Sequence, residues 1–138
     1  MRTTRVQAIG EVHHRSLVGV WLVFVISQVL FFAFSLVIFP NNDLGFLHTF
    51  RWPIAVLGLM LAVDSFRWRR KILFSKKLDR ATAVNRAYIV AFSLSEVTAL
   101  YGLMLRFAAF RYYYILFAVG AIALMLHYPR KEQVLAAQ

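Results

Sequence analysis

Residues 87–110 read AYIVAFSLSEVTALYGLMLRFAAF, an apolar run with a single acidic residue, Glu96, near its middle. As a helix rising about 1.5 Å per residue, the run is long enough to cross a bilayer core of about 30 Å. It therefore predicts a transmembrane helix over 87–107. An acid in the centre of such a helix costs about 2.5–3.5 kcal/mol or more on insertion scales, so Glu96 is a candidate functional residue.

The composition of the whole chain agrees with a membrane protein. Of its 138 residues, 61% are hydrophobic, whereas an ordinary soluble domain is roughly 45–50% apolar. The length suits one domain, which we expect to cover residues 1–138. The chain has no cysteine, and this excludes disulfides, thiolate metal sites and cysteine nucleophiles.

Three further apolar runs predict transmembrane helices, and they cover residues 16–39, 52–71 and 112–128. The first has no charged residue and ends before Pro40, and the last ends before Pro129. Prolines at these places are typical helix stops. The middle run begins at Trp52–Pro53 and must continue past Asp64 to span a bilayer. We therefore predict an all-α, polytopic membrane protein with four transmembrane helices in one compact bundle.

The basic residues predict the orientation of this bundle. The loop at 67–86 is strongly basic. If it lies in the cytoplasm, 13 of the 16 Lys and Arg residues lie inside, as the positive-inside rule favours. Both termini are then cytoplasmic, and a bacterial chain of this kind is a multi-pass protein of the inner membrane. This orientation accounts for the net charge of +10 without a nucleic-acid partner.

The same basic belt predicts contacts with anionic lipid head groups, at roughly 1 kcal/mol for each Lys or Arg near the surface. The residues expected to make these contacts are Arg69, Arg70, Lys71, Lys76 and Lys77. We interpret them as generic lipid contacts rather than a defined binding site.

Glu96 has predicted partners at its own depth. Gln28 lies near the middle of the first helix, so it faces Glu96 if the first and third helices pack together. Ser93 and Ser95 lie near Glu96 on its own helix, and Tyr101 completes the candidate ion-binding group. Two interpretations remain open. Glu96 is either a neutral, protonated acid that joins helices by hydrogen bonds or a site that handles protons or cations.

Small residues predict one closely packed face of the third helix. Small residues recur at spacings of three to four, at Ala91, Ser95, Thr98 or Ala99, and Gly102. Such a face allows helices to approach closely. It suits packing within the bundle and association of several copies equally well.

Asp64 stands three residues before Arg67, a spacing that predicts an ion pair within the second helix near its inner end. The alternative interpretation is a second proton site at Asp64. The four histidines, at 13, 14, 48 and 127, do not place two ligands within spans at one depth. We therefore expect no haem, no pigment and no metal.

The letters around Glu96 resemble a known family. The segment 95–103, SEVTALYGL, is similar to the carboxylate helix of the rotor, or proteolipid, subunit of rotary ATP synthases, in which a Glu or Asp carries the ion. The resemblance implies an ion-carrying role for Glu96. That family has a glycine repeat in the preceding helix, where this chain has only Gly58. A looser similarity, in size, helix count and basic charge, is to the small four-helix accessory protein of bacterial ATP synthases.

The sequence contains no recognisable catalytic triad, phosphate-binding loop or metal-spaced acid cluster, so we expect no enzyme. The expected function is proton or cation handling at an intramembrane carboxylate, or an accessory role beside ion-coupled membrane machinery. The alternative is a purely structural accessory subunit of a larger respiratory, photosynthetic or transport complex. The expected partners are the lipid bilayer and other membrane subunits or further copies of the chain.

Overall fold

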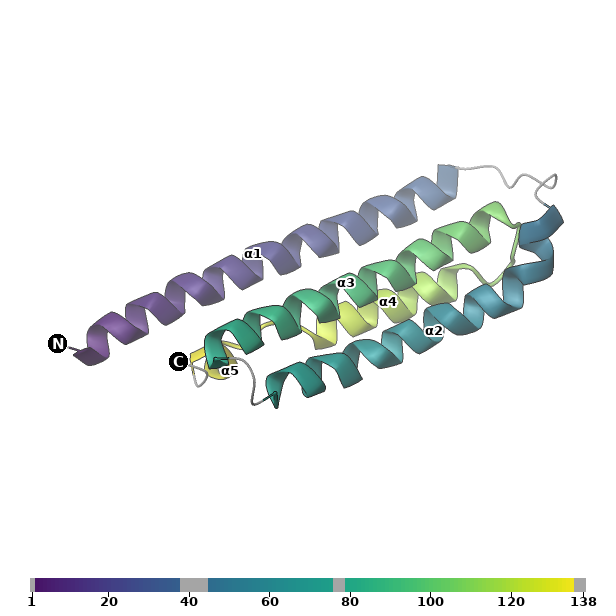
Figure 1. The fold of residues 1–138 in the computed structure, drawn as a ribbon. Coiled ribbons are helices and arrows are strands. Elements are labelled where there is room, and N and C mark those ends of the chain that lie inside the picture. Colours follow the sequence, from purple (N-terminus) through teal and green to yellow (C-terminus); the bar gives the residue numbers. More distant parts are fainter. Residues whose placement is uncertain (1, 38–44, 76–78, 136–138) are drawn as a thin grey trace.

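A computed structural model describes residues 2–37, 45–75 and 79–135, and it is all-α over these ranges. Three long helices and a shorter one, α4, run side by side, and the five-residue helix α5 follows them (Figure 1). They are α1 (Arg2–Val37), α2 (Gly45–Leu73), α3 (Arg80–Phe107), α4 (Tyr114–Leu126) and α5 (Lys131–Leu135). The predicted fold class is confirmed as an all-α bundle.

Three of these helices contain runs that are long and apolar enough to cross a membrane, namely Glu11–Val37, Thr49–Leu73 and Arg80–Phe107. The fourth, α4, is apolar but has 13 residues. At about 1.5 Å per residue it extends about 20 Å, less than a bilayer core of about 30 Å. The crossing expected over 112–128 is therefore shorter as a helix than predicted.

The helices begin at other residues than hydropathy predicted. α1 begins at Arg2 instead of residue 16, because its polar lead continues the same helix. α2 begins at Gly45, so the prediction that Trp52–Pro53 opens it is wrong. Pro53 lies inside α2, where a proline removes one backbone donor and is tolerated when neighbouring helices support the chain.

The predicted basic loop at 67–86 is mostly helical. α2 continues to Leu73, and α3 begins at Arg80 after Asp79, whose carboxylate accepts a hydrogen bond from the Thr82 backbone N–H at 3.1 Å. This is an N-cap, which satisfies one of the free donors at a helix start. Lys76 and Lys77, predicted lipid contacts, lie outside the described residues.

A turn sets the start of α4 later than predicted. Ala109 adopts a left-handed conformation with φ of 53°, which ends the path of α3 and directs the chain back along the bundle. The prediction placed the helix start at residue 112, but residues 111–113 form turns, and the helix begins at Tyr114. The structure also adds α5, which was not predicted.

Helix α3 is the centre of the bundle and contacts α1, α2 and α4 (Figure 1). Its small-residue face is fully buried at Ala91, Ser95 and Ala99, as predicted. A β-carbon added at Gly102 would lie 3.1 Å from the Phe117 ring, and one added at Gly120 would lie 3.0 Å from the Ser95 carbonyl oxygen. The small residues therefore set the close approach of α3 and α4.

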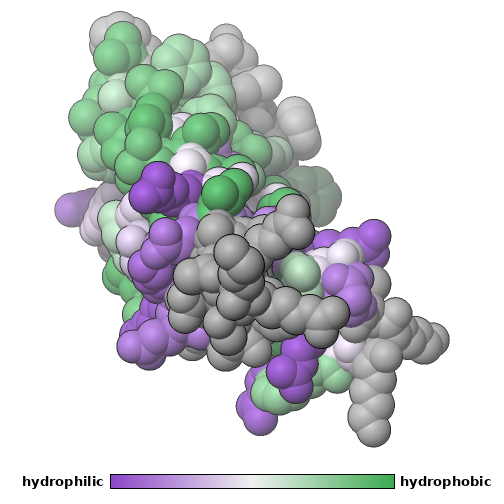
Figure 2. Space-filling model, turned by 90° about the vertical axis from the view of Figure 1, so that its left-hand side faces the viewer, coloured by the Kyte–Doolittle hydropathy of each residue, from purple (hydrophilic) through white to green (hydrophobic). Residues whose placement is uncertain are grey.

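Polar and apolar surfaces separate along the length of the bundle. Figure 2 views the end that carries the beginning of α1 and the short helix α5, and hydrophilic side chains gather there while hydrophobic side chains cover the part behind. The end of α2, with Arg70 and Lys71 in its last turn, belongs to this polar end.

Candidate functional site

Glu96 lies on α3 where that helix meets α1. The Ser27 hydroxyl, from α1, donates a hydrogen bond to Glu96 Oε1. The second carboxyl oxygen, Oε2, is buried and has no hydrogen-bond partner among the residues that the structure describes. The carboxyl group is therefore half satisfied, with one oxygen that accepts a bond and one that is available to carry a proton.

Gln28, the next residue of α1, also binds α3. Its Nε2 donates to the Ser95 carbonyl oxygen at 3.1 Å, and its side chain is buried, with 5% of the residue exposed. The predicted pairing of the first and third helices at this depth is confirmed by these contacts. Gln28 does not bind Glu96 itself, because consecutive helical residues point about 100° apart and Ser27 occupies that position.

The other members of the predicted group make no hydrogen bond with the Glu96 side chain in the described structure. The Ser95 hydroxyl donates to the Ala91 carbonyl oxygen at 2.9 Å within α3. Ser93 is half-buried, and no hydrogen bond joins its side chain to Glu96 in the described structure. Tyr101 packs against an apolar cluster that includes Ile54 of α2. The structure thus groups Glu96 with Ser27, Gln28 and Ser95, but not with Tyr101.

A second polar cluster, which sequence reasoning missed, joins α2, α3 and the end of α4. His127 is fully buried; its Nε2 lies 2.8 Å from Ser65 Oγ and its Nδ1 lies 3.2 Å from Arg69 Nη1. Arg69 also donates to the Tyr88 hydroxyl at 3.0 Å, and its guanidinium lies 4.6 Å from the centre of the Tyr88 ring. Arg69 therefore faces the interior instead of serving only as the predicted lipid contact.

The donors in this cluster determine the tautomer of His127. A guanidinium only donates, so Nδ1 of His127 must accept, and its proton is on Nε2. That proton is donated to Ser65 Oγ, and the Ser65 hydroxyl donates to the Ala62 carbonyl oxygen at 2.6 Å. His127 lies one residue beyond the last residue of α4.

The predicted pair of Asp64 and Arg67 is confirmed, with 3.4 Å between the carboxylate and guanidinium atoms. The two side chains are 36% and 77% exposed, so the pair lies at the surface. Arg70 and Lys71 are also exposed, as expected for lipid contacts, and the Lys71 ammonium lies 4.9 Å from the Trp68 ring centre. Within the described ranges, no group of three or more His, Cys, Asp or Glu side chains has the geometry to hold a metal ion.

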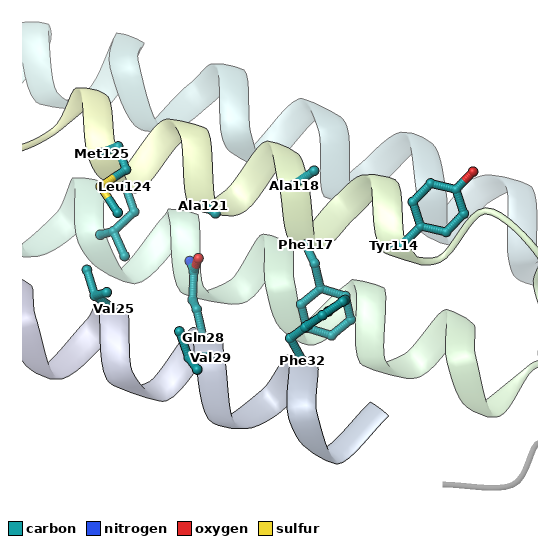
Figure 3. Close-up of a pocket in the computed structure, with 10 residues that line it drawn as sticks. All are labelled: Val25, Gln28, Val29, Phe32, Tyr114, Phe117, Ala118, Ala121, Leu124 and Met125. Atoms are coloured by element: carbon teal, nitrogen blue, oxygen red, sulfur yellow. The ribbon is translucent and has the colours of Figure 1, made fainter. Parts of the chain in front are cut away.

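Two apolar grooves flank α4. One, of about 420 Å³, lies between α1 and α4, and Figure 3 shows the Gln28 side chain in its wall. The other, of about 510 Å³, lies between α2 and α4, with Arg67 at one end. Both are lined almost entirely by apolar side chains.

Comparison with known proteins adds no relative: the chain matches no family model, and neither the curated proteins nor the solved structures give a significant match. The geometry of the site is therefore the basis for any functional conclusion.

Proposed function

We propose that this chain is a small non-enzymatic membrane protein in which Glu96 takes up and releases a proton inside the bilayer, alone or beside ion-coupled membrane machinery. In this proposal α1, α2 and α3 cross the membrane, and α4 contributes the fourth, shorter pass. The polar end shown in Figure 2 lies in the cytoplasm with both termini, because it carries most of the basic residues.

The observation that carries the proposal is the half-satisfied carboxyl group. Glu96 Oε1 accepts from Ser27, whereas the buried Oε2 has no partner in the described part of the chain. An unpaired polar atom in hydrocarbon is costly, and a proton on Oε2 removes the negative charge there. The local segment 95–103, which resembles the ion-carrying helix of rotor subunits, supports the same role.

The chemistry of the site favours a proton over a metal cation. Calcium and similar hard cations take six to eight oxygen ligands, but the oxygens gathered around Glu96 are few. Among the residues that the structure describes, the Ser27 hydroxyl is the hydrogen-bond partner of the Glu96 carboxyl group. A carboxyl group with one hydroxyl neighbour is sufficient to bind a proton.

The experiment is to replace Glu96 by Gln, which keeps the shape and an acceptor for Ser27 but cannot titrate. In proteoliposomes with a pH gradient, the wild-type protein, with any partner subunits that co-purify, should move protons, and Glu96→Gln should abolish this movement. Ser27→Ala is the matched control, because it removes the hydrogen bond but keeps the carboxyl group. Equal proton movement by wild type and Glu96→Gln would contradict the proposal.

A second candidate function is that of a structural accessory subunit. The hydrogen bonds that join α1 to the other helices favour it. Polar contacts bind α1 along its whole length: Trp21 Nε1 donates to the Leu124 carbonyl at 2.9 Å, and Arg106 Nε donates to the Ser35 carbonyl at 2.9 Å. In lipid, such bonds rather than apolar burial hold helices together. Under this alternative Glu96 stays protonated and joins helices, and Glu96→Gln leaves assembly with the partner complex intact.

A further inference from the structure

The groove between α2 and α4 is apolar along its length and basic at one end. It has a volume of about 510 Å³, and large apolar side chains line it from both helices, among them Leu59, Val63, Phe66, Ile122 and Leu126. Each of these five residues is between 40% and 63% exposed. The groove is therefore open along the outside of the bundle, where a ligand can enter it.

The basic end of the groove belongs to α2. The lining residues Leu59, Val63 and Phe66 recur at three to four residues, a spacing that keeps side chains on one face of a helix. The same spacing continues from Phe66 to Arg70, and Arg67 itself lines the groove. This face of α2 thus changes from apolar to basic within about 6 Å along the helix axis.

Both arginines are accessible to a ligand. The Arg67 side chain is 77% exposed, and its ion pair with Asp64 is long, at 3.4 Å. An exposed pair of this kind holds its partners weakly, so another anion can compete with Asp64 for the guanidinium. Arg70 is exposed as well, and side chains three residues apart are neighbours on a helix surface. The end of the groove therefore offers two guanidinium groups to one anion.

A phospholipid matches both parts of the groove. The ring centre of His127, directly after α4, lies 4.3 Å from that of Phe66, so Arg67 is level with the end of α4. The last turn of α2 belongs to the polar end of the bundle, and hydrophobic side chains cover the part behind it (Figure 2). A head group at Arg67 and Arg70 would therefore lie at the membrane boundary, with its acyl chain along the apolar groove.

The charge of the basic end selects among phospholipids. The planar guanidinium of arginine binds phosphate oxygens through two parallel hydrogen bonds. A zwitterionic head group would also bring an ammonium group close to two like charges. An anionic head group brings no such repulsion, and each arginine near the surface favours it. The groove is thus complementary to an anionic lipid in both charge and polarity.

We propose that the groove between α2 and α4 is a defined site for one anionic phospholipid. Its phosphate accepts hydrogen bonds from Arg67 and Arg70, and one acyl chain lies between the two helices. This site goes beyond the generic lipid contacts predicted from the sequence, since Arg67 was not among them and the groove holds the chain together with the head group. The site does not use Glu96, so it is independent of the proposed proton function.

The test is native mass spectrometry of the full chain in detergent, titrated with dioleoyl phosphatidylglycerol or dioleoyl phosphatidylcholine. The first lipid bound to the wild-type protein should be phosphatidylglycerol, with about thirtyfold preference, since each of two arginines contributes roughly 1 kcal/mol. Arg67→Gln and Arg70→Gln should each lower this preference about fivefold. Glu96→Gln should keep it, which separates this proposal from the proton function. Equal affinity of the wild type for both lipids would overturn the proposal.

The matched control for charge is Arg86→Gln, which removes one exposed arginine from α3, outside the lining of the groove. It should keep the thirtyfold preference. If Arg86→Gln lowers the preference as much as Arg67→Gln does, the attraction is that of the whole basic end, and the proposal of a defined site is wrong.

A second pair of variants tests the acyl chain. Val63→Trp fills the groove but leaves both arginines in place, and it should lower the affinity for phosphatidylglycerol at least tenfold. Ala121→Trp, in the groove between α1 and α4, is its control and should bind phosphatidylglycerol normally. Unchanged binding by Val63→Trp would contradict the proposal. So would a wild-type dimer, seen in the same spectra, that Val63→Trp dissociates, because the groove would then be an interface between copies.

Discussion

Two buried polar groups of this chain differ in how completely their hydrogen bonds are made. His127 has both ring nitrogens paired, to Arg69 and to Ser65. Glu96 has one oxygen paired, to Ser27, and one without a partner in the part of the chain that the structure describes. A fully satisfied network holds a single arrangement of its members, so we interpret the His127 cluster as structural. The half-satisfied carboxyl group retains the capacity for a change of protonation.

The pair of Asp64 and Arg67 predicts a small effect. Since both side chains are at the surface, replacing Asp64 by Asn should lower the free energy of unfolding by about 0–1 kcal/mol. Any proton movement through the protein should remain. Loss of proton movement in a folded Asp64→Asn protein would instead favour the alternative interpretation, a second proton site.

At the scale of the helices, packing depends on places where a side chain would not fit. Gly120 of α4 lies against the backbone of α3, and a β-carbon there would be 3.0 Å from the Ser95 carbonyl oxygen. Backbone cannot move aside as a flexible side chain does. We therefore expect Gly120→Ala to destabilise the bundle by about 1–3 kcal/mol, the usual cost of overpacking, in thermal unfolding monitored by circular dichroism.

Gly19 provides the matched control, because a β-carbon there would meet no atom within 4 Å. Gly19→Ala should be neutral or stabilising by up to about 1 kcal/mol, since alanine is the better helix former. If both variants unfold at the same temperature, close packing of α3 and α4 at Gly120 is not what limits stability.

Sequence reasoning predicted the long helices well and the residues at which they begin poorly. Apolar runs identify α1, α2 and α3, because membrane-length hydrophobicity is a strong signal. Hydropathy cannot show that polar residues continue the same helix, as they do between Arg2 and Ser16. Nor can it show the left-handed turn at Ala109 that delays α4.

The sequence predicted the level at which the residues of the candidate site lie, but not the directions in which their side chains point. Glu96 and Gln28 were correctly placed at one level, yet the choice between Ser27 and Gln28 as the partner of Glu96 depends on the rotation of α1 about its axis. The cluster of Arg69 and His127 joins residues 58 positions apart. The rotation of α1 and the contact between Arg69 and His127 are visible only in the packed structure, because no local sequence pattern encodes them.

For the whole molecule, the structure brings three segments to one end. The Lys131 ammonium of α5 lies 2.8 Å from the Glu11 carboxylate of α1, and His14 Nε2 lies 3.0 Å from the Pro129 carbonyl oxygen. These contacts place the beginning of α1 beside the region after α4. The antiparallel path of α2 and α3 brings the last residues of α2 and the first residues of α3 to the same end of the bundle (Figure 1).

The last prediction is therefore that this shared end is cytoplasmic. The chain has no cysteine, so single cysteines can be introduced without background. Lys77→Cys lies in the sequence between α2 and α3, and Gly45→Cys is at the first residue of α2. A membrane-impermeant thiol reagent applied to intact cells should label Gly45→Cys and not Lys77→Cys, because positive charge is retained inside. Gln138→Cys then tests whether the short helix α4 completes a fourth pass. Protection of position 138 is expected, since α5 is bound to the beginning of α1, and labelling of position 77 or 138 from outside would contradict the orientation.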